Sequence, residues 1–266
     1  MKDTMNGFAL ALEDVKEGVC SIHVWPMLGW QEIKQRYRRS ALGPFWITLS
    51  TGVMIGAMGP LYGRLLGQDV AAYLPYLGIG MIVWLLIANL LNESCYTFIS
   101  ASGYIQQLKL PLTVHVLRMV YRNLIIFAHH LVVIALLLFF YPPKLHWTLL
   151  LMPLGVAAIA VNAIWLGMLL GVVSARFRDV PQFVSSLVPL VFFVTPVIWK
   201  AEMLGRYRWA ADINPVSHLL EVVRAPLLGD PVSSQTWLAL LATTIVGYAI
   251  ALTAFARFRA RIAYWV

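Results

Sequence analysis

The stretch LPYLGIGMIVWLLIANLLNESCYTFI (residues 74–99) is apolar almost throughout and holds one charged residue, Glu93. About 20 apolar residues in a helix cross the ~30 Å hydrocarbon core of a bilayer. Five further apolar stretches occupy about 43–66, 117–141, 149–174, 182–199 and 236–256. Their apolar residues run continuously rather than alternating with a period of two, which indicates helices and not the strands of a membrane barrel. The sequence therefore predicts an all-α integral membrane protein with six transmembrane helices.

The composition of the whole chain agrees with this class. Of its 266 residues, 60% are hydrophobic and 12% are charged, and the mean hydropathy is +0.76. Both features lie far from those of soluble domains, which argues against most soluble enzymes. A nucleic-acid-binding function is not expected, because no basic domain exists apart from the membrane flanks.

The placement of lysine and arginine predicts the orientation. These residues cluster in every second gap between the apolar stretches, at 34–39, at Lys109 with Arg118 and Arg122, at Arg176 with Arg178, and at 257–261. Cytoplasmic loops carry the excess of basic residues, so both termini are expected in the cytoplasm. Residues 1–25 lack a long apolar core, which indicates a cytoplasmic N-terminal arm of modest order rather than a cleavable signal peptide.

Motifs of catalysis and metal binding are missing from the sequence. It has no Gly-x-x-x-x-Gly-Lys-Ser/Thr loop for ATP phosphates and no His-Glu-x-x-His pattern for zinc. The adjacent His129 and His130 would point ~100° apart on a helix and make a poor shared metal site. Neither a disulfide nor a metal site is expected at Cys20 and Cys95. We therefore expect no metal and no cofactor bound by this chain itself.

One carboxylate falls inside an apolar stretch. An unpaired charge at the position of Glu93 would cost ~2.5–3.5 kcal/mol, so this side chain needs a partner or water. Arg118 and Arg122 open the next span at similar depth, one helical turn apart. We expect Glu93 to form an intramembrane ion pair with Arg118 or Arg122 that ties the second and third spans together. A proton-coupling carboxylate is the alternative, although no second acid forms a relay with it.

The segment 200–235 is external by the charge alternation, yet half of it is apolar. Asn214-Pro215 is typical of a helix start, and the helical pattern of 216–229 is too short to cross a bilayer. We expect two short re-entrant helices that dip into the outer leaflet. A hairpin lying on the membrane surface is the alternative.

Three polar residues of this segment, His218, Glu221 and Arg224, recur every three positions. On a helix they lie close to one face, where Glu221 and Arg224 can pair. They form either a stripe facing solvent and headgroups or a polar latch on an external gate.

Glycines and aromatic residues mark further surfaces of the spans. Gly52, Gly56, Gly59 and Gly63 form one small-residue stripe, which serves packing within the chain, a dimer seam or a conduit wall. Aromatic rings near span ends anchor a protein in the membrane interface, although they also suit the C–H faces of sugars. The candidate conduit and gate residues are Phe45, Trp46, Tyr62, Phe192, Phe193, Trp199, His218, Glu221 and Arg224.

Two segments on the cytoplasmic side have helical patterns outside the spans. In 26–40, aromatic and aliphatic residues alternate with Glu32, Arg36 and other charged residues, which suits an amphipathic helix lying in the membrane interface. The segment 101–112 is too polar to cross the membrane and long enough for a small helix.

The ordered pieces together resemble the membrane-spanning permease subunit of bacterial polysaccharide ABC exporters, which move O-antigen, capsule or teichoic-acid chains. The resemblance is carried by WQEIKQRYRRSALGPFW (30–46), GYIQQLKLPL (103–112) and NPVSHLLEVVRAPLLG (214–229). With the six-span plan, it covers nearly the whole chain beyond residue 25. The resemblance implies one permease domain over 26–266, with an interface helix at 26–40, a coupling segment at 101–112 and an external gate region at 200–235.

The resemblance also implies partners. A separate ATP-binding cassette subunit would bind ATP and Mg, and a second copy of this chain would complete the conduit. The residues expected to couple to that ATPase are Gln31, Glu32, Arg36, Arg38, Arg39, Tyr104, Gln107 and Lys109. The substrate would be a lipid-linked polysaccharide, the surrounding partners membrane lipids, and the location the bacterial inner membrane.

Two other functions stay open at this stage. A drug or small-lipid exporter would share the architecture, although the segment RYRRSALGPFW and the aromatic content favour the polysaccharide class. A membrane enzyme acting on lipid-linked sugars would need paired acids or a His/Asp cluster at membrane depth, where only Glu93 is present. No motif specifies which glycan is moved.

Overall fold

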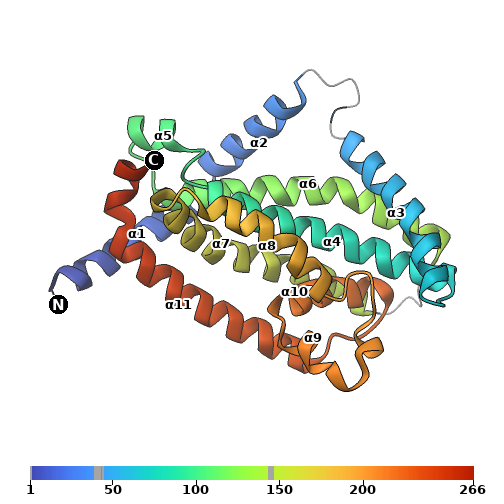
Figure 1. Cartoon of the computed structure of the whole chain (residues 1–266). Helices are drawn as coiled ribbons and strands as arrows, with labels where there is room; N and C mark the ends of the chain where they lie inside the picture. Colours follow the sequence, from blue (N-terminus) through green and yellow to red (C-terminus); the bar gives the residue numbers. More distant parts are fainter. Residues whose placement is uncertain (1, 39–42, 44, 143–146) are drawn as a thin grey trace.

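The structure is a computed structural model that describes residues 2–38, 43, 45–142 and 147–266. Within these ranges every regular element is a helix, which confirms the all-α prediction (Figure 1). The elements are α1 Lys2–Cys20, α2 Val24–Tyr37, α3 Phe45–Leu65, α4 Val70–Tyr96, α5 Ser102–Gln107, α6 Leu112–Phe140, the 3-10 helix η1 Trp147–Leu151, α7 Met152–Arg176, α8 Val180–Val194, the 3-10 helix η2 Ala201–Tyr207, α9 Trp209–Ile213, α10 Pro215–Leu228 and α11 Ser234–Trp265.

Among the described residues, five helical segments are long and apolar enough to cross a membrane: α3, α4, α6, η1 with α7, and α11. The sequence predicts a further span at 182–199, but α8 has only 15 residues and ends at Val194. Thr195 adopts an extended conformation with ψ of 135° because the residue before a proline, here Pro196, is disfavoured in the helical region. The predicted six spans therefore correspond to five long helices and one shorter apolar helix.

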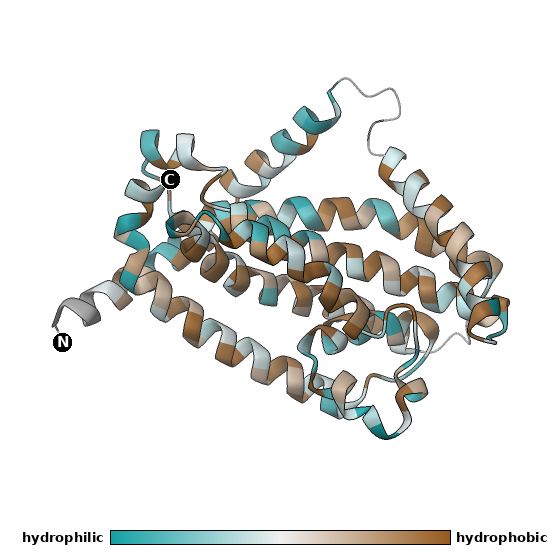
Figure 2. Cartoon of the chain, in the orientation of Figure 1, coloured by the Kyte–Doolittle hydropathy of each residue, from teal (hydrophilic) through white to brown (hydrophobic). Residues whose placement is uncertain are grey.

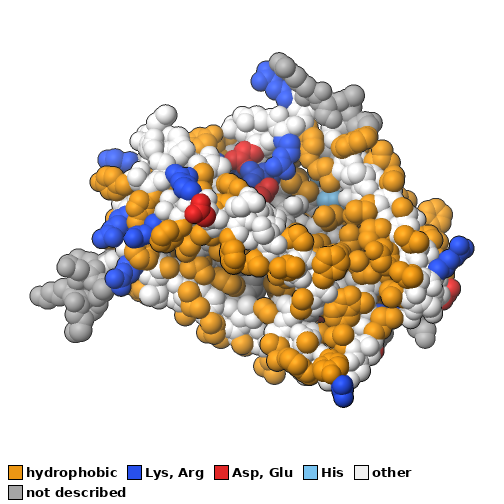
Figure 3. Space-filling model, viewed as in Figure 1, with side chains coloured by type: hydrophobic (Ala, Val, Ile, Leu, Met, Phe, Trp, Pro, Cys, Tyr) orange, Lys and Arg blue, Asp and Glu red, His pale blue; other side chains and the backbone are white. Residues whose placement is uncertain are grey.

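The spans form a bundle around α4. Of the apolar window of α4, 72% is buried inside the protein, against 17% for α3, so α4 is central and α3 peripheral. Apolar residues predominate along the spans, and many of the hydrophilic residues lie at the two ends of the bundle and on α2 (Figure 2). Apolar side chains also cover the visible flank of the bundle, as lipid contact requires (Figure 3).

The two ends of the bundle differ (Figure 1). Both chain termini and α5 lie at one end, which we call the termini end, and α9 and α10 lie at the other, the α10 end. Helix α10 begins where the sequence predicts it. The Asn214 side chain accepts a hydrogen bond from the Val216 amide, Pro215 occupies the first turn, and Gly229 ends the helix with a positive φ of 83°.

The N-terminal segment differs from the expectation of an arm of modest order, because residues 2–20 form α1. A stripe of small and buried residues, Gly7, Ala11, Asp14 and Gly18, lets α1 approach α11 and α6 closely. A Cβ atom on Gly18 would lie 2.8 Å from the side chain of Thr113. Helix α11 is also longer than the predicted 236–256 span, since the basic tail continues it to Trp265.

The glycine stripe of α3 divides into two halves. Added Cβ atoms on Gly59 and Gly63 would meet α4 side chains at 2.5 and 3.3 Å. Added Cβ atoms on Gly52 and Gly56 would meet nothing within 4 Å. Half of the stripe therefore serves packing within the chain, while the other half is open in the single chain.

Candidate functional site

An ionic cluster joins α2, α4 and α6 near the termini end. It consists of Glu32 and Arg36 of α2, Glu93 of α4, and Arg118 and Arg122 of α6. Arg122 Nη2 lies 2.7 Å from Glu93 Oε2, and Arg118 Nη1 lies 3.0 Å from Glu32 Oε1. Arg122 also pairs with Glu32, and Arg36 Nη2 lies 3.6 Å from Glu93 Oε1. The cluster links the helix outside the spans to two helices within the bundle.

Helical spacing brings these charges together. Glu32 and Arg36 are four residues apart on α2, as are Arg118 and Arg122 on α6, so each pair shares one face of its helix. Helix α2 approaches α6 closely at Gly29, where an added Cβ would lie 3.2 Å from the Arg118 carbonyl oxygen. Acidic and basic side chains are seen gathered on the bundle beside α2 (Figure 3).

The two arginines that the sequence offers as partners of Glu93 take different partners in the structure. Arg122 pairs with Glu93, but Arg118, whose exposed fraction is 3%, pairs with Glu32 instead. Glu32 was named among the residues that couple to the ATPase, and the sequence does not reveal that α2 also packs on α6. Asn123 is a further member that was missed, and its amide donates a hydrogen bond to Glu93 Oε2. All of these carboxylates have cationic partners.

Helix α5 occupies the segment predicted to couple to an ATPase. It has no buried residues, and Tyr104, Gln107 and Lys109 are all exposed. Helix α5 also contacts the C-terminal residue, because the side-chain amide of Gln106 donates a hydrogen bond to the Val266 carbonyl oxygen at 2.9 Å. The guanidinium of Arg118 lies 5.6 Å from the centre of the Tyr104 ring, which brings α5 next to the ionic cluster.

The remaining residues predicted for coupling lie on α2 or beyond it. Gln31, Arg36 and Arg38 are exposed, although Arg36 also reaches Glu93. Arg39 lies outside the described residues.

At the termini end, Asp14 is a buried residue that sequence reasoning missed. Its carboxylate accepts hydrogen bonds from the amides of Leu112 and Thr113 at 3.1 and 3.0 Å, and from the Thr113 hydroxyl at 2.8 Å. It also pairs with Arg259 of α11 at 3.2 Å. Asp14 thus caps the start of α6, directly after the α5 segment. It joins α6 to α1 and to α11.

At the α10 end, residues 195–199 between α8 and η2 form turns and bends rather than a helix. Side chains of α4 and α10 satisfy its carbonyl groups. The single O–H of Tyr76 is shared between the carbonyl oxygens of Trp199 and Pro196, at 3.0 and 3.3 Å, and Tyr73 donates to that of Ile198 at 2.7 Å. The carbonyl groups of this irregular segment thus have hydrogen-bond partners within the protein, the condition under which such backbone is tolerated inside a bilayer.

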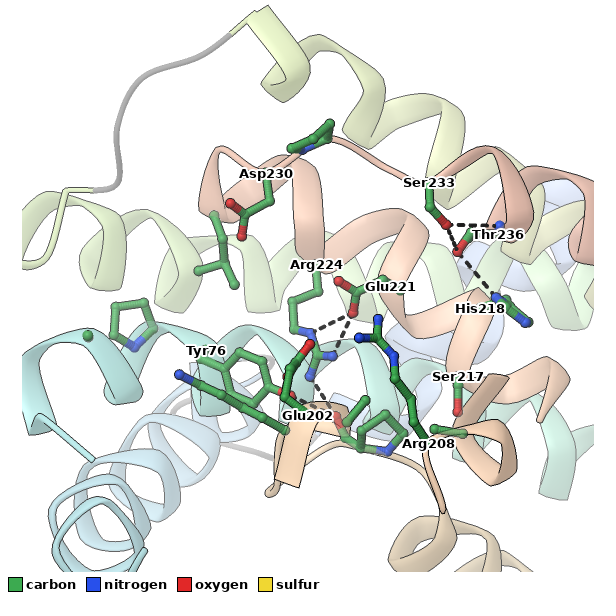
Figure 4. Close-up of a pocket in the computed structure, with 18 of the residues that line it drawn as sticks. Tyr76, Glu202, Arg208, Ser217, His218, Glu221, Arg224, Asp230, Ser233 and Thr236 are labelled. Carbon is green, nitrogen blue, oxygen red and sulfur yellow. Dashed lines mark hydrogen bonds and ion pairs between the residues drawn. The ribbon is translucent and has the colours of Figure 1, made fainter. Parts of the chain in front are cut away.

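Arg224 of α10 contacts the same segment beside Tyr76 (Figure 4). Its Nη1 donates to the Pro196 carbonyl oxygen at 2.7 Å, and its Nη2 pairs with Glu221 Oε2 at 2.6 Å. The guanidinium also lies 4.1 Å from the centre of the Tyr76 ring. Only 3% of Arg224 is exposed. We call the group of Arg224, Glu221, Tyr76 and the Pro196 carbonyl the arginine latch.

The third residue of the predicted polar stripe, His218, bonds to other groups. Its Nε2 lies 2.8 Å from the Asp212 carbonyl oxygen, and its Nδ1 lies 3.2 Å from the Thr236 hydroxyl. His218 therefore links α10 to α9 and α11, while Arg224 links it to Pro196 in the segment after α8 and to Tyr76 of α4 (Figure 4).

Helix α10 also lies deep beside α4. A Cβ atom on Gly80 would lie 3.4 Å from Nη1 of Arg224. Gly80 is ten residues beyond Val70 along α4, about 15 Å at 1.5 Å per residue. Arg224 of this short helix therefore reaches about 15 Å along α4 from Val70, and the re-entrant arrangement stays a prediction.

The predicted conduit aromatics do not converge within one chain. Phe45 and Trp46 are exposed at the start of α3, and Tyr62 is half-buried on the same helix. The rings of Phe192 and Phe193 contact each other on α8, and Phe192 also contacts Trp84. Trp199 follows α8 and donates its indole N–H to the Phe193 carbonyl oxygen.

A sequence model of the family described as ABC-2 type transporter matches residues 24–228. The chain belongs to this family. The matched range begins with α2 and ends with α10, so it contains the ionic cluster, α5 and the arginine latch. Helices α1 and α11 lie outside it.

Three relatives are similar to this ABC-2 protein over most of its length or a large part of it. Two are O-antigen export system permease proteins RfbA of Klebsiella pneumoniae. One is 22% identical over 240 residues, 88% of this chain and 91% of the relative, and the other is 22% identical over 231 residues, 83% and 87% respectively. The protein of the same description from Myxococcus xanthus is 24% identical over 169 residues, 64% of this chain and 65% of the relative.

Proposed function

We propose that this chain is the permease subunit of an ATP-driven exporter that moves a lipid-linked polysaccharide, of O-antigen or capsule type, from the cytoplasm across the bacterial inner membrane. The observation that carries the proposal is its similarity to an O-antigen export permease across 88% of its length. The chain is then a transport subunit and not an enzyme. A transport subunit does not need to catalyse a reaction on its substrate. The carboxylates of Asp14, Glu32 and Glu93 are already paired with arginines.

The topology of the proposed permease has six crossings, with the termini end in the cytoplasm. The excess of lysine and arginine at 34–39 and 257–261 supports this orientation. Helix α8 would make the fifth crossing together with the irregular residues 195–199, whose carbonyls Tyr73, Tyr76 and Arg224 satisfy. Residues 26–266 would form a single permease domain, preceded by the cytoplasmic segment 1–25.

An ATP-binding cassette subunit would dock on α5 and α2 and would hold the ATP and Mg. The exposed side chains of Tyr104, Gln107 and Lys109 support α5 as the docking element. A second copy of the chain would supply the other wall of the conduit, for which the open half of the α3 glycine stripe at Gly52 and Gly56 is available.

The contacts of the chain allow a route for the movement. Closure of the ATPase subunits would push α5 and α2, and the ionic cluster would transmit that displacement to α4 and α6. Helix α4 carries Tyr76 at its other end, so its displacement would loosen the arginine latch. Release of residues 195–199 would then open the α10 end to the polymer.

The first experiment is to locate the glycan in cells lacking this chain. Lipid-linked polysaccharide retained on the cytoplasmic side, with surface polymer lost, is the expected result. Normal surface polymer with altered drug or lipid handling would contradict it and support the small-substrate exporter. Failure to make the polymer at all would support an enzyme.

Docking is tested separately by co-purification of the ATPase with variants of the full-length chain. Tyr104→Ala should weaken co-purification, because it removes an exposed ring from α5. Tyr264→Ala is the matched control, since Tyr264 is 88% exposed at the same end but belongs to α11. Equal retention of the ATPase by both variants would argue against α5 as the docking element.

A further inference from the structure

A cavity of about 900 Å³ opens at the α10 end, beside the arginine latch (Figure 4). Its walls come from the first turns of α4, residues 140–142, residues 196–212, and α10 with the following loop to Thr236. This volume lies near the upper end of the 300–1,000 Å³ range of small-molecule sites, so it can hold more than a single sugar ring. We call it the α10 cavity.

Most carboxylate oxygens that line the α10 cavity accept no hydrogen bond from the described residues. Figure 4 draws no contact from Glu202 or Asp230, and neither side chain has a hydrogen-bonding or ion-pair partner within the described residues. Glu221 makes its contacts with Arg224 through Oε2 alone. Three carboxylate groups therefore present acceptor oxygens to whatever enters.

Most of the cationic side chains that line the cavity already contact other groups of the protein. Arg224 is held by Glu221 and the Pro196 carbonyl oxygen. Lys200 Nζ donates to Gln68 Oε1 at 3.0 Å and lies over the Tyr76 ring. Arg208 is the least engaged, with Asp212 4.0 Å away.

These observations define the chemistry of a ligand. The lining contains four carboxylates, of Glu202, Asp212, Glu221 and Asp230, against three basic side chains, so it disfavours anions. Unpaired carboxylate oxygens form strong hydrogen bonds with O–H donors. A ligand rich in hydroxyl groups and without negative charge satisfies both conditions.

We propose that the α10 cavity is a binding site for uncharged sugar residues of the exported polymer, with Glu202 and Asp230 accepting hydrogen bonds from sugar hydroxyls. The inference rests on the proposed export function and adds a sugar-binding site on the far side of the membrane from the ATPase. Its position next to the arginine latch would let the leaving polymer hold residues 195–199 away from Arg224 and Tyr76.

The test is saturation-transfer NMR on the full-length chain in lipid nanodiscs. The probes are maltotetraose, a neutral tetrasaccharide, and tetragalacturonate, an acidic one of the same length. We expect signal transfer to maltotetraose and not to tetragalacturonate. Transfer to both probes alike, to the acidic probe alone, or to neither would overturn the proposal.

Variants then locate the binding. The double variant Glu202→Gln, Asp230→Asn changes two exposed side chains and should weaken maltotetraose binding at least about tenfold, as expected for the loss of charge-assisted hydrogen bonds. Glu13→Gln, an exposed acid on α1 at the other end, should leave binding unchanged. Unaltered binding by the double variant would overturn the assignment.

A bound calcium ion is the competing occupant. Competition of millimolar calcium with maltotetraose at a site abolished in the double variant, together with calcium binding in the absence of sugar, would identify a cation site instead. The proposed function fails separately, when cells lacking the chain retain their surface glycan. Loss of surface glycan in those cells with no sugar binding at Glu202 and Asp230 would overturn the cavity inference alone.

Discussion

Glu93 of α4 and Arg122 of α6 form an ion pair with Oε2 and Nη2 2.7 Å apart, and the other oxygen of Glu93 faces Arg36 of α2. One carboxylate therefore contacts side chains of two other helices. Because Glu93, Arg118 and Arg122 are poorly exposed, separation of α2 from the bundle would leave buried charges without partners. Helix α2 and the two spans are expected to move as a unit.

The first prediction concerns the strength of this link. Glu93→Gln should lower the free energy of unfolding by about 2 kcal/mol. This is less than the ~3–5 kcal/mol of a fully buried broken pair, because the side chains retain some solvent access. The measurement is unfolding of the purified chain in lipid–detergent micelles, combined with surface glycan in cells, which should also decrease.

The matched control for Glu93→Gln is Glu13→Gln, which removes an exposed carboxylate from α1. It should change neither stability nor export. If Glu93→Gln were as stable as the unaltered chain but inactive, the side chain would act in transport itself, as a proton-coupling carboxylate would.

Hydropathy located the spans because a bilayer demands continuous apolar length, and that demand is local in sequence. The end of α8 was less accessible, because an apolar run through Pro196 resembles a span until the conformation of Thr195 is known. The ordering of α1 was missed for a different reason. Its apolar residues do recur at helical spacing, but the close contact of Gly18 with Thr113 of α6 joins distant segments and cannot be predicted from residues 2–20 alone.

The contacts of the candidate site also differ in whether they could be predicted from local sequence. The pairing of Glu221 with Arg224 follows from spacing along one helix and could be predicted. The pairing of Arg118 with Glu32 joins two helices, and nothing in either segment alone specifies it. Asp14 was missed because a buried cap cannot be told from an exposed acid until its amide partners are located.

The second prediction compares a glycine at which an added Cβ atom would clash with one at which it would meet no other atom. A Cβ atom at Gly155 of α7 would lie 2.4 Å from the carbonyl oxygen of Val222 on α10. Gly155→Ala should therefore displace α10 and destabilise the chain by about 1–3 kcal/mol, as overpacking does. The measurement is thermal unfolding of the purified chain.

Gly56→Ala provides the comparison, because an added Cβ meets nothing within 4 Å. As a single chain it should be unchanged or stabilised by up to about 1 kcal/mol, since alanine favours helix. A larger side chain in Gly56→Leu should weaken association of two copies if this surface is the dimer seam, which cross-linking in membranes would report. Equal destabilisation by Gly155→Ala and Gly56→Ala would contradict the packing described here.

The third prediction concerns the cap at the start of α6. Asp14→Ala removes the acceptor for the Leu112 and Thr113 amides and should destabilise this turn by about 1–2 kcal/mol. Hydrogen exchange at both amides should accelerate, because local opening becomes easier. Asp14→Asn keeps one acceptor oxygen and should have a smaller effect. Glu17→Gln, on the exposed face of the same helix, is the control and should leave the exchange rates unchanged.

The fourth prediction concerns the arginine latch. Arg224→Ala removes the donor to the Pro196 carbonyl oxygen and leaves Glu221 without its partner, so residues 195–199 should loosen. Proteoliposomes with this variant should leak a small neutral dye in the absence of ATP. Arg224→Lys retains the charge but cannot make both contacts with fixed geometry, and should leak to an intermediate degree. Arg208→Lys changes an exposed arginine at the same end and should remain tight. Tight vesicles with Arg224→Ala would show that the latch does not close the α10 end, and that a second copy of the chain or the α10 helix itself seals it.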